Sequence, residues 1–253
     1  MNLITLSLAI IFVIIPLFLS KTLNLGLEKD TIIATIRSIF QLLFIGYLLQ
    51  YIFDSENIMY ILLMVVLMIA AAVQNARTKG VYITGIIWKL AVTFLFVEVL
   101  TQAILLGLDI IPPTAQYIIP ISGMVIGNSM VFGILFLNRL IAEMSSHQGE
   151  TELILSLGGT PKQAIHRQLI ASIKASTIPT IEQQKVTGLV QLPGMMSGLI
   201  ISGADPVQAV MFQLLVLFLI LTAAVITSVM LAYLSYPTLF NQRMQLLEAR
   251  LKQ

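Results

Sequence analysis

The sequence predicts an all-α protein that crosses a membrane about seven times and carries a helical elbow outside the bilayer. Two observations lead to this fold class. The chain of 253 residues is 58% hydrophobic and only 10% charged, with a mean hydropathy of +0.96, whereas a soluble domain is about one-quarter charged. Apolar stretches of about 20 residues, the length that crosses the hydrocarbon core as a helix, also recur along the chain.

Seven stretches have the length and composition of a transmembrane helix. They are 3–20, 31–53, 57–76, 86–106, 118–138, 186–203 and 207–234. The first lacks a basic segment before it and a small-residue cleavage site after it, so we interpret it as a retained helix. We expect the whole chain, 1–253, to form a single transmembrane domain.

Basic residues predict how the helices are oriented. The loops near 54–57, 107–117 and 204–206 contain acidic residues but no Lys or Arg, whereas the opposite loops and the C-terminal tail contain many. We expect the protein to lie in a bacterial plasma membrane. The positive-inside rule then places its N-terminus outside the cell and its C-terminus in the cytoplasm. The tail, 241–253, has the pattern of a polar helix.

The longest segment between predicted spans is 141–180, and it begins with a short apolar helix. Glu150 and Glu152 stand near the start of this helix, where negative charge favours the helix dipole. Gly158 and Gly159 follow it and allow a left-handed turn, or the close approach of another protein surface.

A second helix is predicted from Thr160-Pro161 onward. Threonine can cap the free N–H groups of a first turn, and proline in that turn loses no hydrogen bond. The helix extends over 161–178 and places three apolar residues on one face: Ile165, Leu169 and Ile173. We interpret the two helices and their turn either as a docking site for a cytoplasmic partner or as an amphipathic element on the membrane surface.

Glu98 is the most unusual residue within a predicted span, because it lies near the middle of the fourth one. A charge at that depth costs roughly 2.5–3.5 kcal/mol on insertion scales. Glu98 therefore either binds a cation or a proton on a translocation pathway, or is protonated and hydrogen-bonded to a neighbouring helix. Asn75 and Asn128 are polar residues in other spans, and they either line the pathway or join helices.

The sixth predicted span holds the other pathway candidates. Glu182 stands where the chain re-enters the membrane, as an interfacial turn or a gate. Pro193-Gly194 then interrupts the span, which marks either a constriction or a simple proline kink. Met195 and Met196 add thioether sulfur, a ligand that suits soft ions such as Cu(I) better than Fe(II) and is more typical of packing. The residues themselves leave any metal ligands unknown.

Several classes of chemistry are excluded. The chain has no cysteine, hence no disulfide, thiolate metal site or cysteine nucleophile. It has neither the Gly-x-x-x-x-Gly-Lys-Ser/Thr loop that holds nucleotide phosphates nor a Gly-x-Ser-x-Gly nucleophile motif. We expect no enzymatic activity and no cofactor in this chain, and no nucleic-acid partner.

Two resemblances sharpen these expectations. Glu152-Leu153-Ile154, three residues and Gly158 resemble the Glu-Ala-Ala-x-x-x-Gly loop with which ATP-binding cassette (ABC) importer permeases contact their nucleotide-binding subunit. The Ile-x-Leu-Pro expected later in that loop is missing. A wider resemblance, to the FetB-type iron-export permease family with its plant relatives linked to aluminium tolerance, rests on four motifs in order: Gln74-Asn75-Ala76-Arg77, 120–128, the elbow, and 178–182 with 185–200.

This resemblance implies a homodimer of permeases in the lipid bilayer, with a separate ABC ATPase subunit that binds ATP and Mg. It implies export of iron or another metal ion, with 141–180 as the coupling segment. Two alternatives remain at this point: an ion-coupled secondary transporter that uses Glu98 and no ATPase, and a membrane scaffold without transport.

Overall fold

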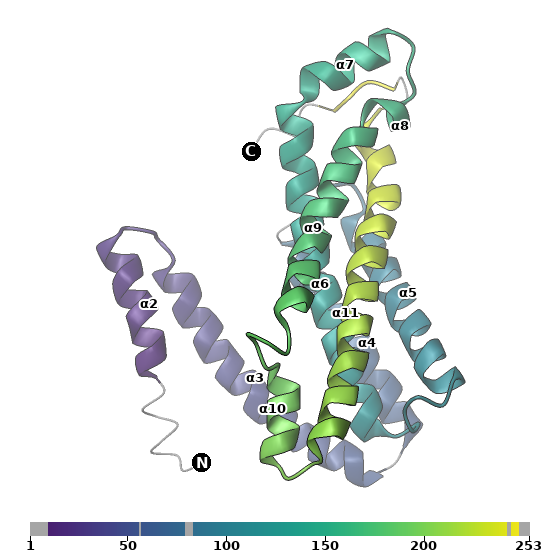
Figure 1. Cartoon of the computed structure of the whole chain (residues 1–253). Helices are drawn as coiled ribbons and strands as arrows, with labels where there is room; N and C mark the ends of the chain where they lie inside the picture. Colours follow the sequence, from purple (N-terminus) through teal and green to yellow (C-terminus); the bar gives the residue numbers. More distant parts are fainter. Residues whose placement is uncertain (1–9, 56, 79–82, 242–243, 248–253) are drawn as a thin grey trace. The chain divides into compact units, whose positions relative to one another are not determined.

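The computed structural model describes residues 10–55, 57–78, 83–241 and 244–247, and these residues form helices joined by short turns (Figure 1). Two isolated β-bridges are also present in this part of the chain. The chain divides into two compact units, 1–57 and 58–253. The all-α prediction is therefore confirmed for the described residues.

The first unit contains a hairpin of two helices, α2 (Ile11–Thr22) and α3 (Glu28–Ser55). Ser20 holds the turn between them, because its Oγ donates to Glu28 Oε1 at 2.7 Å and accepts from the N–H of Leu27 at 3.2 Å. Asn24 and Gly26 in this turn have φ values of 51° and 71°, a conformation that asparagine and glycine tolerate well.

The second unit contains all the remaining helices. They are α4 (Ile58–Arg77), α5 (Ile86–Gly107), α6 (Ala115–Ser146), α7 (Gln148–Ser156), α8 (Pro161–Ala164), α9 (His166–Val186), α10 (Gly194–Ile201), α11 (Pro206–Ser235) and the 3₁₀ helix η1 (Tyr236–Leu239). Helix α6 packs against α4, α9 and α11 and is the central member of this bundle. The short helices α7 and α8 lie at one end and α10 lies at the other (Figure 1).

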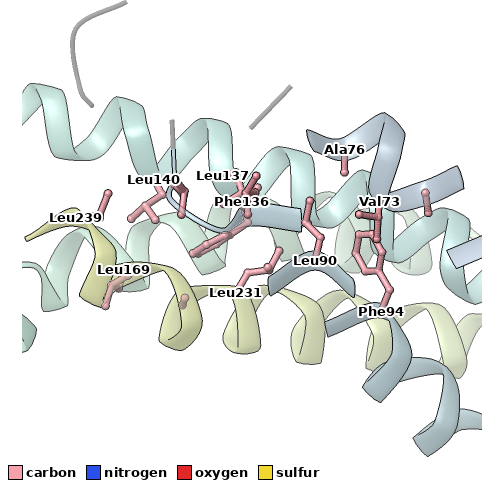
Figure 2. Packing of buried hydrophobic residues seen from close by; sticks show 14 of the residues in the cluster. Val73, Ala76, Leu90, Phe94, Phe136, Leu137, Leu140, Leu169, Leu231 and Leu239 are labelled. Atoms are coloured by element: carbon pink, nitrogen blue, oxygen red, sulfur yellow. The ribbon is translucent and has the colours of Figure 1, made fainter. Parts of the chain in front are cut away.

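A large apolar cluster holds this bundle together near the α7–α8 end. Figure 2 shows side chains from α4, α5, α6, α9 and α11 meeting there: Val73, Ala76, Leu90, Phe94, Phe136, Leu137, Leu140, Leu169 and Leu231. Close approach of α6 and α11 depends on small residues, since a Cβ on Gly133 would lie 3.1 Å from Leu231 Cδ1. Ala223 and Ala224 of α11 are likewise fully buried, which is typical of helix contacts in membranes.

Five helices are long and apolar enough to cross a membrane, among the residues described: Glu28–Phe53, Ile58–Arg77, Ile86–Gly107, Ala115–Ser146 and Pro206–Leu239. These correspond to five of the seven predicted spans. Of the predicted first span, residues 3–9 lie outside the described residues and the rest enters the shorter apolar helix α2.

The predicted sixth span, 186–203, is wrong as a single helix. Helix α9 ends at Val186, residues 187–193 are not helical, and α10 has only eight residues. The chain leaves the helix because Thr187 is extended and Gly188 has a φ of 92°. What runs beside α11 is therefore the composite of α9, this break and α10 (Figure 1).

Two further expectations are corrected. The predicted second elbow helix, 161–178, is divided at Ile165 and continues to Val186, and it packs against α6 and α11 within the bundle. The C-terminal tail is not a helix in its described part: Asn241 and 244–247 form a turn in which Phe240 pairs with Leu246. Leu246 packs against the apolar cluster, which explains why this turn folds back.

Candidate functional site

Glu98 forms a buried polar cluster with Gln102 and Ser122, between α5 and α6. Ser122 Oγ donates to Glu98 Oε1 at 2.5 Å, and Gln102 Nε2 donates to the same oxygen at 3.0 Å. Gln102 Nε2 also donates to Ser122 Oγ at 2.9 Å. Only 2% of Glu98 is exposed and Ser122 is fully buried, so the cluster lies inside the protein.

The surroundings of this cluster are apolar. The neighbouring residues Val97, Ile121 and Val125 belong to a second hydrophobic cluster, together with Ala223 of α11. No ion pair to Glu98 occurs within the described part of the chain. An isolated carboxylate is costly in such a place, which makes Glu98 a functional candidate on structural as well as sequence grounds.

The sequence indicated only one of the three members of this cluster. The spacing of Glu98 and Gln102, four residues apart on one helix, could have suggested that their side chains meet. Ser122 comes from another helix, and its pairing with Glu98 depends on how α5 and α6 pack. No local pattern encodes that contact.

The two predicted asparagines do not join this cluster. Asn75 Nδ2 donates to Met130 Sδ at 3.3 Å, a contact between α4 and α6. Asn128 Nδ2 donates to the carbonyl oxygen of Met124 at 2.8 Å, within its own helix. Both contacts are typical of polar residues in membrane helices, which bind either a side chain of a neighbouring helix or a carbonyl of their own helix.

The break between α9 and α10 has a compact turn at its start. The N–H of Val190 donates to the Val186 carbonyl at 3.0 Å, and the N–H of Gly188 donates to the Gln191 carbonyl at 2.9 Å. Leu189 and Val190 are 94% and 82% exposed. Pro193 does not kink a helix, so the simple-kink alternative is wrong: it is the residue before the first turn of α10, and its extended backbone lets α10 begin at Gly194.

Charged side chains lie along the exposed face of α9 as far as this break. Lys174, Glu182 and Lys185 are all exposed, and Lys185 Nζ pairs with Glu182 Oε1 at 2.7 Å. The opposite face of α9 is bound to α11, since Ser176 and Ser228 hydroxyls are 2.8 Å apart and Gln184 Nε2 donates to the Leu217 carbonyl at 2.8 Å.

A cavity of about 340 Å³ lies between α6, α10 and α11. Its lining includes two of the methionines with a stacked aromatic pair, Tyr117 and Phe212, whose ring centres are 5.8 Å apart. Met195 and Met124 both line this cavity, whereas Met196 is half-buried and is not part of the lining. Among the described residues, no three His, Asp or Glu side chains gather to hold a metal ion.

The corner between α7 and α8 has the local structure that the sequence predicted. Gly158 has a φ of 86°, in the left-handed region. Thr160 and Gln163 form a reciprocal capping box at the start of α8, with Pro161 in the first turn. We call residues 148–164 the α7–α8 corner.

Ion pairs and a cavity further define this corner. Glu150 Oε1 lies 3.6 Å from Arg167 Nη1 on α9, and Glu152 accepts from Gln148 Nε2 at 2.8 Å. A cavity of about 730 Å³ separates Glu152 and the two glycines from the C-terminal turn at 244–246. Leu153 and Leu157 project from α7 and its end with 59% and 79% of their surfaces exposed.

Comparisons with known proteins are consistent with a membrane permease. Residues 3–240 match the family described as "Uncharacterised protein family (UPF0014)". The chain is 55% identical over 246 residues to "UPF0014 membrane protein YjkA" of Bacillus subtilis, covering 97% of this chain and 98% of that protein. No solved structure matches the chain.

Two other relatives have names that state a function. "Probable iron export permease protein FetB" of Escherichia coli is 38% identical over 248 residues, which cover 98% of this chain and 96% of that protein. "Protein ALUMINUM SENSITIVE 3" of Arabidopsis thaliana is 34% identical over 244 residues, with coverage of 94% and 87%. The match extends over nearly the whole bundle described above, and the chain belongs to the UPF0014 family of membrane proteins.

Proposed function

We propose that this chain is the membrane subunit of an ATP-driven exporter of iron or another metal ion in a bacterial plasma membrane. In this proposal it pairs with a second copy of itself and with a separate ABC ATPase subunit, which binds ATP and Mg. The named function of the Escherichia coli relative supports the metal cargo. The α7–α8 corner is the observation that supports coupling to an ATPase.

The corner is built as a rigid projection. Its turn is held by the capping box and by the N–H of Gly159, which donates to the Ile154 carbonyl at 2.9 Å. Leu157 is exposed beside this turn. Exposure to water does not stabilise a leucine side chain, so an apolar contact with a partner would be favourable here. A projecting, rigid and partly apolar corner fits a binding groove on another protein.

Movement of the corner would be passed to the bundle by α9. Ile165, at the junction of α8 and α9, is fully buried in the apolar cluster. Lys162 Nζ lies 5.3 Å from the centre of the Tyr233 ring on α11, a cation–π contact. A push on α7 and α8 therefore acts on α9, which ends at the break and leads to α10 and the cavity beside it.

Charge at the two ends of the second unit supports the proposed orientation. Arg77, Arg139 and Arg167 belong to the α7–α8 end, where α4 and α6 finish and α9 begins, whereas Asp109 and Asp205 belong to the opposite end (Figure 1). The positive-inside rule assigns the basic end to the cytoplasm, which is the compartment that supplies ATP to an ATPase subunit.

The experiment compares two exposed leucines at opposite ends of the bundle. Leu157→Asp places a charge on the corner, and Leu108→Asp places one on the residue after α5, where Leu108 is 70% exposed. Each variant is coexpressed with a candidate ABC ATPase subunit from the same genome. The readouts are copurification of the ATPase and the iron retained by cells loaded with radioactive iron.

The wild type and Leu108→Asp are expected to copurify with the ATPase and to lower cellular iron, and Leu157→Asp is expected to lose both properties while inserting normally. Copurification and iron export that are undiminished in Leu157→Asp would contradict coupling through the corner. Loss of iron on expression of the wild type without any ATPase would instead favour a secondary transporter.

A further inference from the structure

The ring of hydrogen bonds around Glu98 uses every hydrogen that its members can supply. An amide nitrogen has two hydrogens and a hydroxyl has one. Gln102 Nε2 donates to Glu98 and to Ser122, and Ser122 Oγ donates to Glu98. Glu98 Oε1 therefore receives two hydrogen bonds, and no donor remains within the ring.

Two buried acceptor atoms are left over. Glu98 Oε2 and Gln102 Oε1 have no hydrogen-bond partner among the described residues and are shielded from solvent. An amide oxygen only accepts, and an ionised carboxylate only accepts. Leaving such atoms unpaired costs about 1–3 kcal/mol for a neutral group and more for a charged one, so the ring lacks positive charge or a donor.

No charged side chain on the surrounding helices supplies that charge. Helices α4, α6 and α11 pack against α5. Within their described residues the charged side chains are Arg77 at the end of α4 and Arg139 with Glu143 in α6, while α11 has none between Pro206 and Ser235. Arg139 is bound to Glu143, and it lies 17 residues after Ser122, which is about 25 Å along the helix.

Lys89, on α5 itself, is also committed elsewhere. Its Nζ donates to Thr238 Oγ1 at 2.7 Å, at the α7–α8 end of the bundle. It precedes Glu98 by nine residues, or about 13 Å of helix. The positive partner of Glu98 must therefore come from outside the described side chains.

We propose that the Glu98–Gln102–Ser122 ring is a binding site for one small monovalent cation, delivered as Na⁺ or as a proton. Carboxylate and amide oxygens are hard ligands that suit such an ion, whereas one carboxylate without a further His, Asp or Glu among the described residues is too few ligands for an iron ion. The bound cation pairs with Glu98 Oε2 and Gln102 Oε1, which both lie on α5, and so stabilises the ring through which Ser122 of α6 is hydrogen-bonded to α5. This inference does not depend on ATP-driven export, because it concerns the ring alone.

The test measures thermal unfolding of the full chain in lipid nanodiscs. NaCl is compared with choline chloride at equal ionic strength in mildly alkaline buffer, and acidic buffer is compared with alkaline buffer in choline chloride. Ligand bound only by the folded state raises the melting temperature. In a protein of this size the expected rise is about 3–6 °C at a tenfold excess of ligand over its dissociation constant and about 5–11 °C at a hundredfold excess. A rise with NaCl identifies an alkali ion, and a rise on acidification alone identifies a proton.

Two variants separate the ring from other titrating groups. Glu98→Gln keeps the shape and removes the charge, so it is expected to fold and to lose the cation-dependent rise. Asp109→Asn removes an exposed carboxylate in the loop after α5, where asparagine suits the φ of 51°, and is expected to respond like the wild type.

Ser122→Ala provides a second measure if Glu98→Gln accumulates poorly. It removes one hydrogen bond to Glu98 Oε1, leaves the charge, and is expected to increase the cation-dependent rise, because the carboxylate then depends more on the ion. A wild type whose melting temperature responds to neither NaCl nor acidification overturns the proposal. So does a response of the same size in Glu98→Gln, since the ion or the proton then acts on groups outside the ring.

Discussion

The two glycines of the α7–α8 corner are needed for different reasons. Gly158 has a left-handed backbone, but a Cβ there would meet no atom within 4 Å. Gly159 has no left-handed backbone, but its Cβ would lie 2.8 Å from the Ile154 carbonyl oxygen and 2.6 Å from a methyl of the same residue. One position is restricted by torsion and the other by space.

Alanine substitutions should therefore differ in effect. Gly158→Ala is expected to lower the free energy of unfolding by about 1–2 kcal/mol, the cost of a left-handed alanine. Gly159→Ala should cost more and displace the corner, because a backbone oxygen cannot rotate away as a side chain can. Thermal unfolding and ATPase copurification measure the two effects.

Gly149→Ala is the matched control for this pair. It lies in the first turn of α7, has open space around its Cβ position and no left-handed backbone. Alanine there should be neutral or stabilising by up to about 1 kcal/mol. Equal losses in all three variants would show that the corner has no special backbone requirement.

At the scale of helices, the sequence was informative where an element is apolar throughout. Helices α3 to α6 and α11 stand out by length and composition alone. Their bounds differ from prediction by at most three residues, except that α6 continues eight residues beyond the predicted end of its span. Helix α9 does not stand out, because Ser172, Ser176 and Thr180 are buried while Lys174 is exposed. Its place in the bundle depends on contacts with α6 and α11, which no local pattern reveals.

The break after α9 was predicted too far along the chain, for a related reason. Pro193 is the strongest local breaker in the stretch, so the sequence assigned the interruption to it. The helix already ends at Val186, seven residues before Pro193, and the positive φ of Gly188 permits the turn that follows it. Pro193 takes no part in that turn. Met195 was a pathway candidate from the sequence, and it lines a cavity whose other walls, on α6 and α11, depend on the packing of three helices.

The exposed face of α9 gives a prediction at this scale. Lys174, Glu182 and Lys185 cannot face hydrocarbon without cost, so we expect this face to contact water in the membrane-bound protein. Because the chain has no cysteine, single cysteines can be introduced at Lys174 and Ile178 and treated with a water-soluble maleimide. Both are expected to react faster than the control, Phe218→Cys.

Phe218 is a suitable control because it is 62% exposed on the apolar helix α11, as Ile178 is 47% exposed on α9. Exposure within the protein is thus similar, and only the surrounding medium differs. Reaction rates that are alike at Ile178 and Phe218 would rule out a water-accessible face on α9.

At the scale of the whole molecule, the orientation proposed from charge can be tested with the same reagent. Asp109→Cys is expected to react in intact cells, and Arg167→Cys only after the membrane is permeabilised, because the two positions lie at opposite ends of the second unit. Labelling of Arg167→Cys in intact cells would reverse the orientation and remove the α7–α8 corner from any cytoplasmic partner.

The polarity of α9 also has a consequence for biosynthesis. A nascent segment with few apolar residues does not partition into lipid by itself, and the break after it leaves α10 too short to span. Helix α9 packs against α6, which is synthesised before it, and against α11, which follows it and binds Ser176 and Gln184 through Ser228 and the Leu217 carbonyl. We therefore expect α9 to take its final place only after α11 has been synthesised, so that the two helices insert together as a late step.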